Sequence, residues 1–528
     1  MKYPKNSEKM LRKLSWKLIR SVSATVTILV SGSSLYFLHQ NDYDLSSIGL
    51  VRFARAGVAV SHIIVDYKWT MWKYRDDVNN YQKGMKAAHR RSALRLLELA
   101  KANGGVFIKV GQHLAASEYL LPQEYTEVLS VLHSRAPESN LKELYKVFEE
   151  DMHKKACIED VFSEFDPRPL GAASLAQVHK AKLKGTNEVV AVKIQHPRVK
   201  PHSLVDIASM EVLARIAAKV FPDFYLSWLV DEVKRNLPIE LDFLNEATNA
   251  DRIRGLYSHL HFLKVPIIYY QYSSSRVLTM EFCEGAQIND LDYLVAKNID
   301  RYDICRKLGI LYSEMIFVKG IVHCDPHPGN VLVHKSPDGD VKIVLLDHGQ
   351  YLNLPDDFRL KYSKLWLAIL KPDQDEIKKY AAEMGVGELY GLFTCMITRR
   401  TWKAVVYGVN KTAFGENEKA EIKAYAASLI TQITEVLQNM PRPLLLILKT
   451  NDLLKSIEYQ LGTYNRADTF IEMSKCCTRS VYEAKMRGKS ILSRIFLLFN
   501  MYTVMLKLIL YEKYQFFINR HYAQSLVL

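Results

Sequence analysis

The chain is poor in cysteine, and its few cysteines show no pattern of a structural or metal-binding role. Seven occur among 528 residues; their number is odd, they are scattered, and none forms a C-x-x-C pair. This argues against a disulfide framework and against a zinc site, and it indicates a reducing compartment or simply buried thiols. The cysteines are Cys157, Cys283, Cys305, Cys324, Cys395, Cys476 and Cys477.

The chain also has fewer acidic than basic residues, and it lacks a nucleic-acid-binding motif. With 57 acidic and 71 basic residues, the net charge is +14, which suits anionic lipid surfaces or nucleic acid. Because the basic residues are not interleaved with aromatic residues, we expect anionic membrane lipids, and no nucleic acid, as partners. A hydrophobic content of 48% is that of a folded globular protein. The length predicts about two to four folded units.

Residues 319–352 have the layout of a phosphoryl-transfer active site. An apolar approach leads to an H-C-D run ending at Asp325, Asn330 follows, and a β-rich run then delivers Asp347. In this pattern Asp325 takes the proton of the acceptor, while Asn330 and Asp347 hold Mg²⁺ on the phosphates of ATP. The alternative is two unrelated aspartates in turns, because Asp, Pro, Gly and Asn are also loop formers.

Residues 169–194 predict a β-hairpin that would lie over a nucleotide. A run of small residues leads into a strand, a turn follows at 184–187, and the last strand carries Lys193. That strand matches the V-A-I-K strand of kinases, whose lysine neutralises ATP phosphates and pairs with a helix glutamate. The loop is rich in alanine where protein kinases have glycine, and methyl groups limit how closely backbone N–H groups approach phosphate. The loop residues expected to cover the nucleotide are Gly171, Ala172, Ala173, Ser174 and Val178.

Two helices are expected between this hairpin and the catalytic stretch. They are predicted at 203–221 and 227–260, and the second carries Glu240 and Glu246 as candidate partners for two isolated lysines. Acidic residues on an exposed helix are common, so this pairing depends on further evidence.

A strand–turn–strand pattern is predicted for residues 265–283. It ends on Glu281 and Phe282, in a position like that of a kinase hinge, whose backbone would contact adenine. These two residues are therefore candidates for nucleotide binding.

The region before the hairpin, residues 46–150, has few prolines and a helical spacing of apolar residues. Inside it, Lys109 and Gln112 are three positions apart and would share one face of a helix. A solvated polar face interrupted by Gly111 is an alternative that spacing alone does not exclude.

Both ends of the chain are basic and contain apolar runs. Residues 1–20 have seven basic residues against one acid, as in a mitochondrial targeting segment. The uncharged run 21–38 is a candidate membrane span, a cleaved signal or a soluble helix. Near the other end, the apolar run 495–511 predicts either a buried packing helix or a membrane-inserted helix. We expect a mitochondrial, membrane-associated protein, at the inner membrane or in the intermembrane space rather than in the matrix.

Together, three motifs resemble the UbiB/aarF-domain family of atypical kinases over roughly residues 90–470. They are a Lys-x-Gly-Gln element (Lys109, Gly111, Gln112), an alanine-rich loop (171–178) and a Glu-x-Asp element (Glu240, Asp242). The resemblance implies that Lys193 pairs with Glu246, and that Lys109 folds over the active site and pairs with Glu240. The extension would then occlude the cleft where a protein substrate lies. ATP (or ADP) and Mg²⁺ would be the cofactors, and lipid-linked mitochondrial functions such as coenzyme Q biosynthesis are associated with the family.

The resemblance also implies a fold: an α+β, bilobal protein-kinase-like structure with a helical N-terminal extension over the active site and a mostly helical C-terminal lobe. We divide the chain accordingly into a targeting or membrane segment (1–45), a helical extension (46–155), an N-lobe with a helical insert (156–283), a C-lobe (284–470) and a basic and apolar helical tail (471–528).

This sequence departs from kinase patterns at several positions. The loop begins with Gly171 rather than alanine, which would soften the family's altered nucleotide preference. His348 stands where the D-F-G motif has phenylalanine, and Cys324 replaces the arginine of H-R-D. No A-P-E motif follows, so control by phosphorylation of an activation loop is not expected. The proposed ligands and base are all retained.

Three functions are compatible with these features. The first is an ATP- and Mg²⁺-dependent kinase or ATPase in mitochondrial lipid homeostasis or membrane organisation, whose acceptor is a lipid or small molecule rather than a protein. The second is a nucleotide-responsive scaffold with turnover near background. The third is an ATPase that extracts or presents a lipid. The acceptor and the protein partners are not determined by the sequence.

Overall fold

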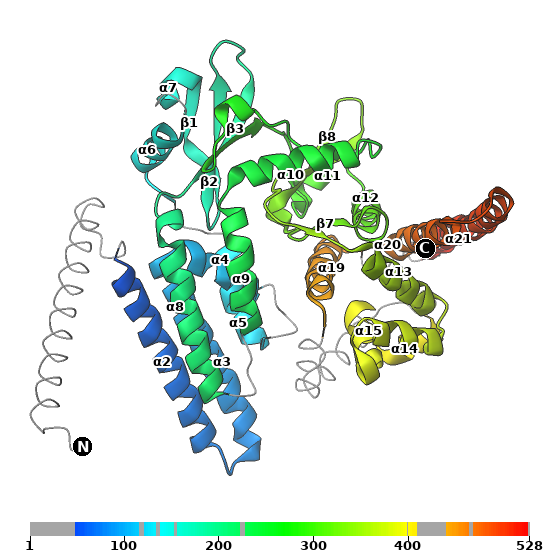
Figure 1. The fold of residues 1–528 in the computed structure, drawn as a ribbon, viewed down its shortest axis with the longest axis horizontal. Helices are drawn as coiled ribbons and strands as arrows, with labels where there is room; N and C mark the ends of the chain where they lie inside the picture. The colour runs from blue at the N-terminus through cyan, green and yellow to red at the C-terminus, as the bar shows by residue number, and fades with distance from the viewer. Residues whose placement is uncertain are drawn as a thin grey trace, which may run out of the picture.

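The fold is bilobal, with a bundle of helices attached to the smaller lobe (Figure 1). This confirms the predicted α+β, kinase-like architecture with a helical extension. The predicted targeting segment and the apolar run 21–38 lie outside the described part of the chain. The computed structural model describes residues 48–115, 121–133, 138–152, 156–221, 227–398, 400–408, 440–463 and 468–525.

The helical extension is built around a long antiparallel hairpin, on which a helix from later in the chain also packs (Figure 1). Its apolar core contains Leu97, Ile108 and Leu129 from the extension and Leu213 from the later helix α8. The helices are α2 (Gly49–Lys73), α3 (Val78–Asn103), α4 (Gly105–Ala115), α5 (Gln123–Leu129), the 3₁₀ turn η2 (Ser130–His133) and α8 (Val199–Val220).

A buried ion pair joins the extension to α8. Arg52 on α2 donates to both carboxylate oxygens of Asp206, at 2.8 and 2.5 Å. Both side chains are almost fully buried. Burial raises the pKa of Asp206, and the neighbouring Arg52 guanidinium opposes that rise. The pair links positions far apart in sequence and was not predicted.

The small lobe is a four-stranded antiparallel sheet in the order β1-β2-β3-β5. The register places Lys193 of β3 opposite Val178 of β2 and Leu278 of β5. One face of the sheet packs on α6 through Leu144 and Phe148. The elements are α6 (Leu141–Asp151), α7 (Ile158–Val161), β1 (Phe162–Ala172), β2 (Ala176–Leu183), β3 (Val189–Gln195), η4 (Tyr270–Tyr272) and β5 (Val277–Glu281).

The single helix predicted at 227–260 is wrong: two helices, α9 (Ser227–Glu240) and α10 (Phe243–Leu256), occupy this stretch. The break lies at Asp242, whose side chain accepts a hydrogen bond from the Leu244 N–H and so caps α10. Asp242 is a favoured N-cap residue because it satisfies an N–H group that the helix leaves unpaired. The cap matters for function, because Glu246 lies in the first turn of α10.

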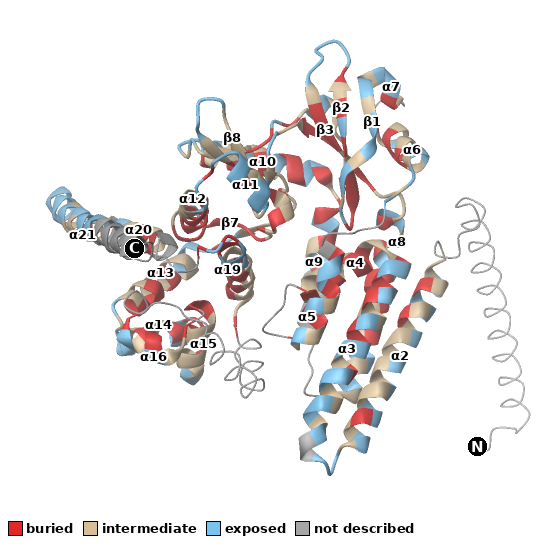
Figure 2. Cartoon of the chain, turned by 180° about the vertical axis from the view of Figure 1, so that it is seen from behind, coloured by how far each residue is buried: buried red, intermediate tan, exposed pale blue. Residues whose placement is uncertain are grey.

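The large lobe combines helices with a second four-stranded sheet in the order β4-β9-β8-β6 and a pair β10-β7. Figure 2 shows buried stretches on the helices and strands of this lobe. Trp366 and Phe317 are among the largest side chains of its core. The strands are β4 (Leu263–Lys264), β6 (Ala286–Gln287), β7 (Ile321–His323), β8 (Val331–Lys335), β9 (Val341–Leu345) and β10 (Tyr351–Asn353). The helices are α11 (Leu291–Ala296), α12 (Arg301–Ser313), the π-helix η5 (Glu314–Lys319), η6 (Pro328–Asn330), α13 (Asp356–Leu370), α14 (Gln374–Glu383), η7 (Gly387–Leu389), α15 (Tyr390–Thr398), α16 (Trp402–Tyr407), α19 (Arg442–Gln460) and α20 (Asp468–Met486).

The last helix, α21 (Ile491–Ser525), packs along α20 and carries the apolar run of the tail (Figure 1). Its stretch Ile491–Leu510 is long and apolar enough to cross a membrane, yet only 6% of it is buried. Large side chains such as Leu492 and Phe499 face solvent. The interpretation of 495–511 as a buried packing helix is therefore wrong.

Candidate active site

The catalytic stretch folds so that its three candidate side chains converge. β7 leads to Asp325, η6 presents Asn330, and β9 ends just before Asp347. The amide of Asn330 donates to the backbone oxygen of Asp325 at 3.2 Å and lies 3.4 Å from Asp325 Oδ2. The Leu346 N–H donates to the Asn330 carbonyl oxygen at 3.0 Å, which ties the two loops together. The unrelated-turns alternative is therefore disfavoured.

Buried histidines fix the backbone on which these side chains stand. His323 Nε2–H donates to the Asp347 carbonyl oxygen at 2.8 Å, and its Nδ1 accepts from the Tyr312 hydroxyl at 3.0 Å. Burial lowers the pKa of His323, so the ring is neutral, as this hydrogen-bond pattern requires.

His348 stands at the position of the phenylalanine in D-F-G, and its side chain is buried as that phenylalanine would be. Its ring stacks on Tyr351, with centroids 5.9 Å apart and planes 11° apart. Nε2–H donates to the Leu345 carbonyl oxygen at 3.1 Å, and Nδ1 accepts from the Tyr351 hydroxyl at 2.8 Å. Burial, aided by His323, lowers the pKa of His348 to about 3. The residue is thus neutral and serves packing rather than proton transfer.

Lys193 lies between the two lobes and contacts carboxylates of both. Its Nζ is 2.8 Å from each oxygen of Glu246 on α10 and 3.6 Å from Asp347 Oδ2. The ion pair implied by the family resemblance is therefore present. Although burial lowers the pKa of Lys193, Asp347 and Glu246 outweigh it and raise that pKa. Burial raises the pKa of Glu246 to about 7, against the lowering effect of Lys193.

The two aspartates remain ionised at neutral pH. Burial by itself raises the pKa of Asp347, but Lys193, Lys109 and the Gly349 N–H together lower it to about 2. Burial by itself would also raise the pKa of Asp325, but the positive charges of Lys449 and Lys109 outweigh burial. The pKa of Asp325 therefore lies well below its usual value.

The donor set fits Mg²⁺. Asp347 offers a carboxylate and Asn330 an amide oxygen, and Mg²⁺ in nucleotide sites binds one or two such protein oxygens together with substrate phosphates and water. Bound there, the metal would neutralise charge on the β- and γ-phosphates. Asp347 keeps its Oδ1 oriented by accepting a hydrogen bond from the Gly349 N–H at 2.8 Å.

The alanine-rich loop is held in shape by side chains behind it. The Ala173 N–H donates to the Ala176 carbonyl oxygen at 2.8 Å, and His196 Nε2–H donates to the Ala173 carbonyl oxygen at 2.9 Å. Ser174 is buried. A Cβ at Gly171 would meet open space, so packing does not require glycine there.

The two hinge candidates use their backbone donors within the protein. The Glu281 N–H donates to the Ile267 carbonyl oxygen at 2.8 Å, and the Phe282 N–H to that of Val189 at 3.4 Å. The Glu281 carboxylate pairs with Lys264 at 2.6 Å. An adenine contact at these residues would therefore need their carbonyl oxygens.

In the Lys-x-Gly-Gln element, Gly111 and Gln112 contribute to packing and Lys109 forms an ion pair. A Cβ at Gly111 would overlap the Leu132 side chain, and Gln112 donates to the Leu132 carbonyl oxygen at 2.9 Å. Both residues thus hold α4 against η2. Lys109 turns the other way and pairs with Glu240 at 2.8 Å, with 18% of its side chain exposed. The alternative of a solvated polar face is wrong.

Lys109 also interacts electrostatically with the candidate carboxylates Asp325 and Asp347. Burial lowers its pKa, but Glu240, Asp325 and Asp347 outweigh burial and raise it. The charge of Lys109 on α4 is therefore coupled to the candidate carboxylates, as expected for an extension over the active site.

One residue of the site was missed. Lys449 on α19 lies with its Nζ 3.6 Å from Asp325 Oδ1. No sequence motif marks it, because it stands far beyond the catalytic stretch in a helix with an ordinary mixture of residues.

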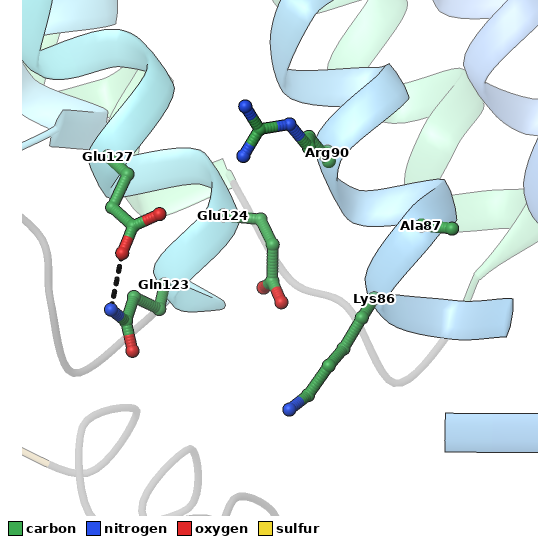
Figure 3. Close-up of a pocket in the computed structure, with 6 residues that line it drawn as sticks. All are labelled: Lys86, Ala87, Arg90, Gln123, Glu124 and Glu127. Atoms are coloured by element: carbon green, nitrogen blue, oxygen red, sulfur yellow. Dashed lines mark hydrogen bonds between the residues drawn. The ribbon is translucent and has the colours of Figure 1, made fainter. Parts of the chain in front are cut away.

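Two hollows in the described part of the chain have linings without Asp325, Asn330 or Asp347. One of about 390 Å³ lies between α3 and α5 (Figure 3) and is lined by Lys86, Ala87, Arg90, Gln123, Glu124 and Glu127. All of these residues except Ala87 have polar or charged side chains, whereas small-molecule sites are lined mostly by apolar side chains with few polar groups. We assign no role to it.

The chain is similar to known proteins over most of its length. A family model, the ABC1 atypical kinase-like domain, matches residues 131–381. AarF domain-containing kinase 1 of Drosophila melanogaster is 47% identical over 87% of this chain and 88% of the relative. AarF domain-containing protein kinase 1 of Mus musculus is 47% identical over 91% and 90%. The ABC1 family protein MCP2 homolog of Schizosaccharomyces pombe is 36% identical over 88% and 84%.

The sequence identity extends over most of each chain, and the Lys193–Glu246 and Lys109–Glu240 ion pairs of the site are those that the family resemblance implies. The chain belongs to the ABC1/AarF family of atypical kinases.

Proposed function

We propose that this protein is an ATP- and Mg²⁺-dependent kinase or ATPase that acts at a mitochondrial membrane, with a lipid or small-molecule acceptor. The observation that carries the proposal is the convergence of Asp325, Asn330, Asp347 and the Lys193–Glu246 pair. Loss of these groups would indicate a dead kinase, and all of them are in place.

The residues divide the reaction between them. Lys193, held by Glu246, would steady the phosphates of ATP. Asn330 and Asp347 would hold Mg²⁺, which would neutralise phosphate charge. Asp325 accepts the proton of the attacking hydroxyl or water. The low pKa of Asp325 keeps it ionised and able to accept a hydrogen bond, so it orients the nucleophile before the proton moves.

The position of α4 supports a non-protein acceptor. Lys109 on α4 interacts electrostatically with Asp325 and Asp347, and the Lys109–Glu240 pair bridges the extension and α9. A bulky polypeptide would have to displace this helix, whereas a small hydroxyl compound or a lipid headgroup would not.

The test is ATP turnover by the full-length protein in liposomes with and without cardiolipin. We expect Asp325→Asn to lower turnover about 100-fold, because a general base contributes about that much or more. We expect the wild-type rate to rise with the anionic lipid. Phosphate tracing into lipid would then separate a lipid kinase from an ATPase.

If the wild type binds nucleotide but turns over no faster than Asp325→Asn, the enzyme proposal fails. A nucleotide-responsive scaffold would then be the better description.

α21 supports attachment to a membrane. The twenty residues Ile491–Leu510 are mostly apolar and about 30 Å long as a helix, the thickness of a bilayer core. Basic residues precede them, and the sequence after them contains Tyr511, Lys513 and Tyr514. Basic and aromatic residues at the two ends of a span are typical interfacial anchors.

Charges placed on this helix should therefore weaken membrane binding. We expect Phe499→Arg with Leu506→Arg to release the protein from liposomes in a flotation assay, because each arginine costs about 2.5–3.5 kcal/mol at a span centre. Leu204→Arg is the matched control, since Leu204 is an exposed leucine on α8, outside α21. Equal release by the control, or none by the double variant, would count against insertion of α21.

A further inference from the structure

The sequence of the catalytic loop contains no lysine or arginine. Residues 323–333 hold two histidines, and both are engaged within the protein: His323 contacts the Tyr312 hydroxyl and the Asp347 carbonyl oxygen, and His327 accepts from the Gly329 N–H. Any fixed positive charge beside the base therefore has to come from another part of the fold. Three lysines reach the site, from α4, β3 and α19.

Two of these lysines are held by glutamates. Lys109 pairs with Glu240 and Lys193 with Glu246, each at 2.8 Å. Lys449 differs, since its ion pair is made with the base itself, at 3.6 Å from Asp325 Oδ1.

The two oxygens of Asp325 face different neighbours. Oδ2 lies 3.4 Å from the amide nitrogen of Asn330, the expected metal ligand. Oδ2 is therefore the carboxylate oxygen that faces the expected metal site. Oδ1 is the oxygen beside Lys449. This is the oxygen left to accept the hydroxyl of the acceptor, and Lys449 stands on that side of the base.

The packing of α19 fixes the origin of the Lys449 side chain. Its neighbours Leu448 and Thr450 are buried, at 2% and 0% exposure, in the large lobe. Arg442, at the start of the helix, donates to the side-chain oxygen of Asn236 on α9 at 2.9 Å. α19 lies beyond residue 381, where the match to the family domain ends.

We propose that Lys449 is a catalytic residue whose ammonium group turns from Asp325 to the phosphoryl group during its transfer. The inference depends on the proposed function. A base must approach the attacking hydroxyl within about 3 Å, and that hydroxyl lies about 3–3.5 Å from phosphorus. A rotamer change of the long lysine side chain spans this distance, and α19 need not move.

The step balances without a further reactant. The acceptor oxygen forms a bond to the γ-phosphorus, the bond from that phosphorus to the β–γ bridging oxygen breaks, and ADP leaves. The proton of the acceptor passes to Asp325. Lys449 takes no part in the proton transfer, and its ammonium group stabilises the negative charge that is dispersed over the transferred oxygens.

The experiment measures kcat and KM for ATP in the full-length protein with Mg²⁺ and cardiolipin-containing liposomes. We expect Lys449→Met to lower kcat about 10- to 100-fold, with KM changed less than about threefold, because the contact forms during transfer. Lys449→Arg should recover part of kcat by restoring the charge. Lys455→Met is the control, since Lys455 is on the same helix and pairs with Glu458 at 2.6 Å.

Several outcomes decide the matter. Normal kcat for Lys449→Met, or a change confined to KM, overturns the role of Lys449 and leaves the proposed function intact. A folded Lys449→Arg no faster than Lys449→Met also overturns it. If Lys449→Met does not fold, Lys449→Ala with added ethylammonium replaces it, and recovery of kcat is then expected. A wild type no faster than Asp325→Asn overturns the proposed function together with this role.

Discussion

Replacing Asp347 by asparagine is expected to weaken Mg²⁺-dependent nucleotide binding and to lower ATP turnover at saturating nucleotide about 1,000-fold. The amide keeps the size of the side chain and an oxygen for the Gly349 N–H, which now donates to Asp347 Oδ1 at 2.8 Å. It removes the charge that binds the metal and attracts Lys193 at 3.6 Å. The measurement is a Mg²⁺ titration of fluorescent ATP binding, followed by turnover at saturating nucleotide.

The control for this variant is Asp340→Asn. Asp340 is exposed and lies on the turn between β8 and β9, so the chemical change is identical and the metal site is untouched. Binding of Mg·ATP by Asp347→Asn with the affinity of the control would contradict the assignment of Asp347 as a metal ligand.

Replacing Arg52 by methionine is expected to reduce the free energy of unfolding by about 3–5 kcal/mol, because Asp206 would be left buried without its partner. Urea unfolding measures the loss. We expect hydrogen exchange to increase first in α2, since the pair joins α2 to α8. Arg91→Met is the control. It removes an ion pair with Asp66 from a half-exposed arginine, and should cost less than about 1 kcal/mol.

The double variant Arg52→Met with Asp206→Leu separates the ion pair from packing. Two apolar side chains of similar size should recover most of the stability. In Arg52→Met alone, burial raises the pKa of Asp206 with no opposition from Arg52. The folded state then takes up a proton more readily than the unfolded state, so the loss of stability should be smaller at about pH 5 than at about pH 8. A loss that persists in the double variant would contradict this account.

The residues of the local motifs were predictable because short stretches of chain place them. Asp325 and Asn330 belong to one loop, and strand β9 delivers Asp347 at a fixed distance along the chain. Lys193 was recognisable from its strand. Its pairing with Glu246 came from the family resemblance, since spacing alone did not distinguish Glu246 from other acidic residues on a helix.

Other features were mispredicted or missed where the context outweighed the local pattern. The apolar spacing of 227–260 continued past Asp242, but the capping preference of that aspartate ended one helix and began another. The apolar composition of the run 495–511 fits a buried helix and a membrane-inserted helix equally well, and in the structure the run is exposed.

The sequence by itself contains the motifs whose resemblance identified the family and implied the two-lobed fold. Covalent spacing within loops and strands also places Asp325, Asn330 and Asp347, the groups proposed as the base and the metal ligands. The tertiary structure decided which distant side chains meet: Arg52 with Asp206, and Lys449 with the base. These pairs form between helices that are far apart in the chain. Their contacts depend on how whole elements pack, and neither spacing nor composition encodes that packing locally.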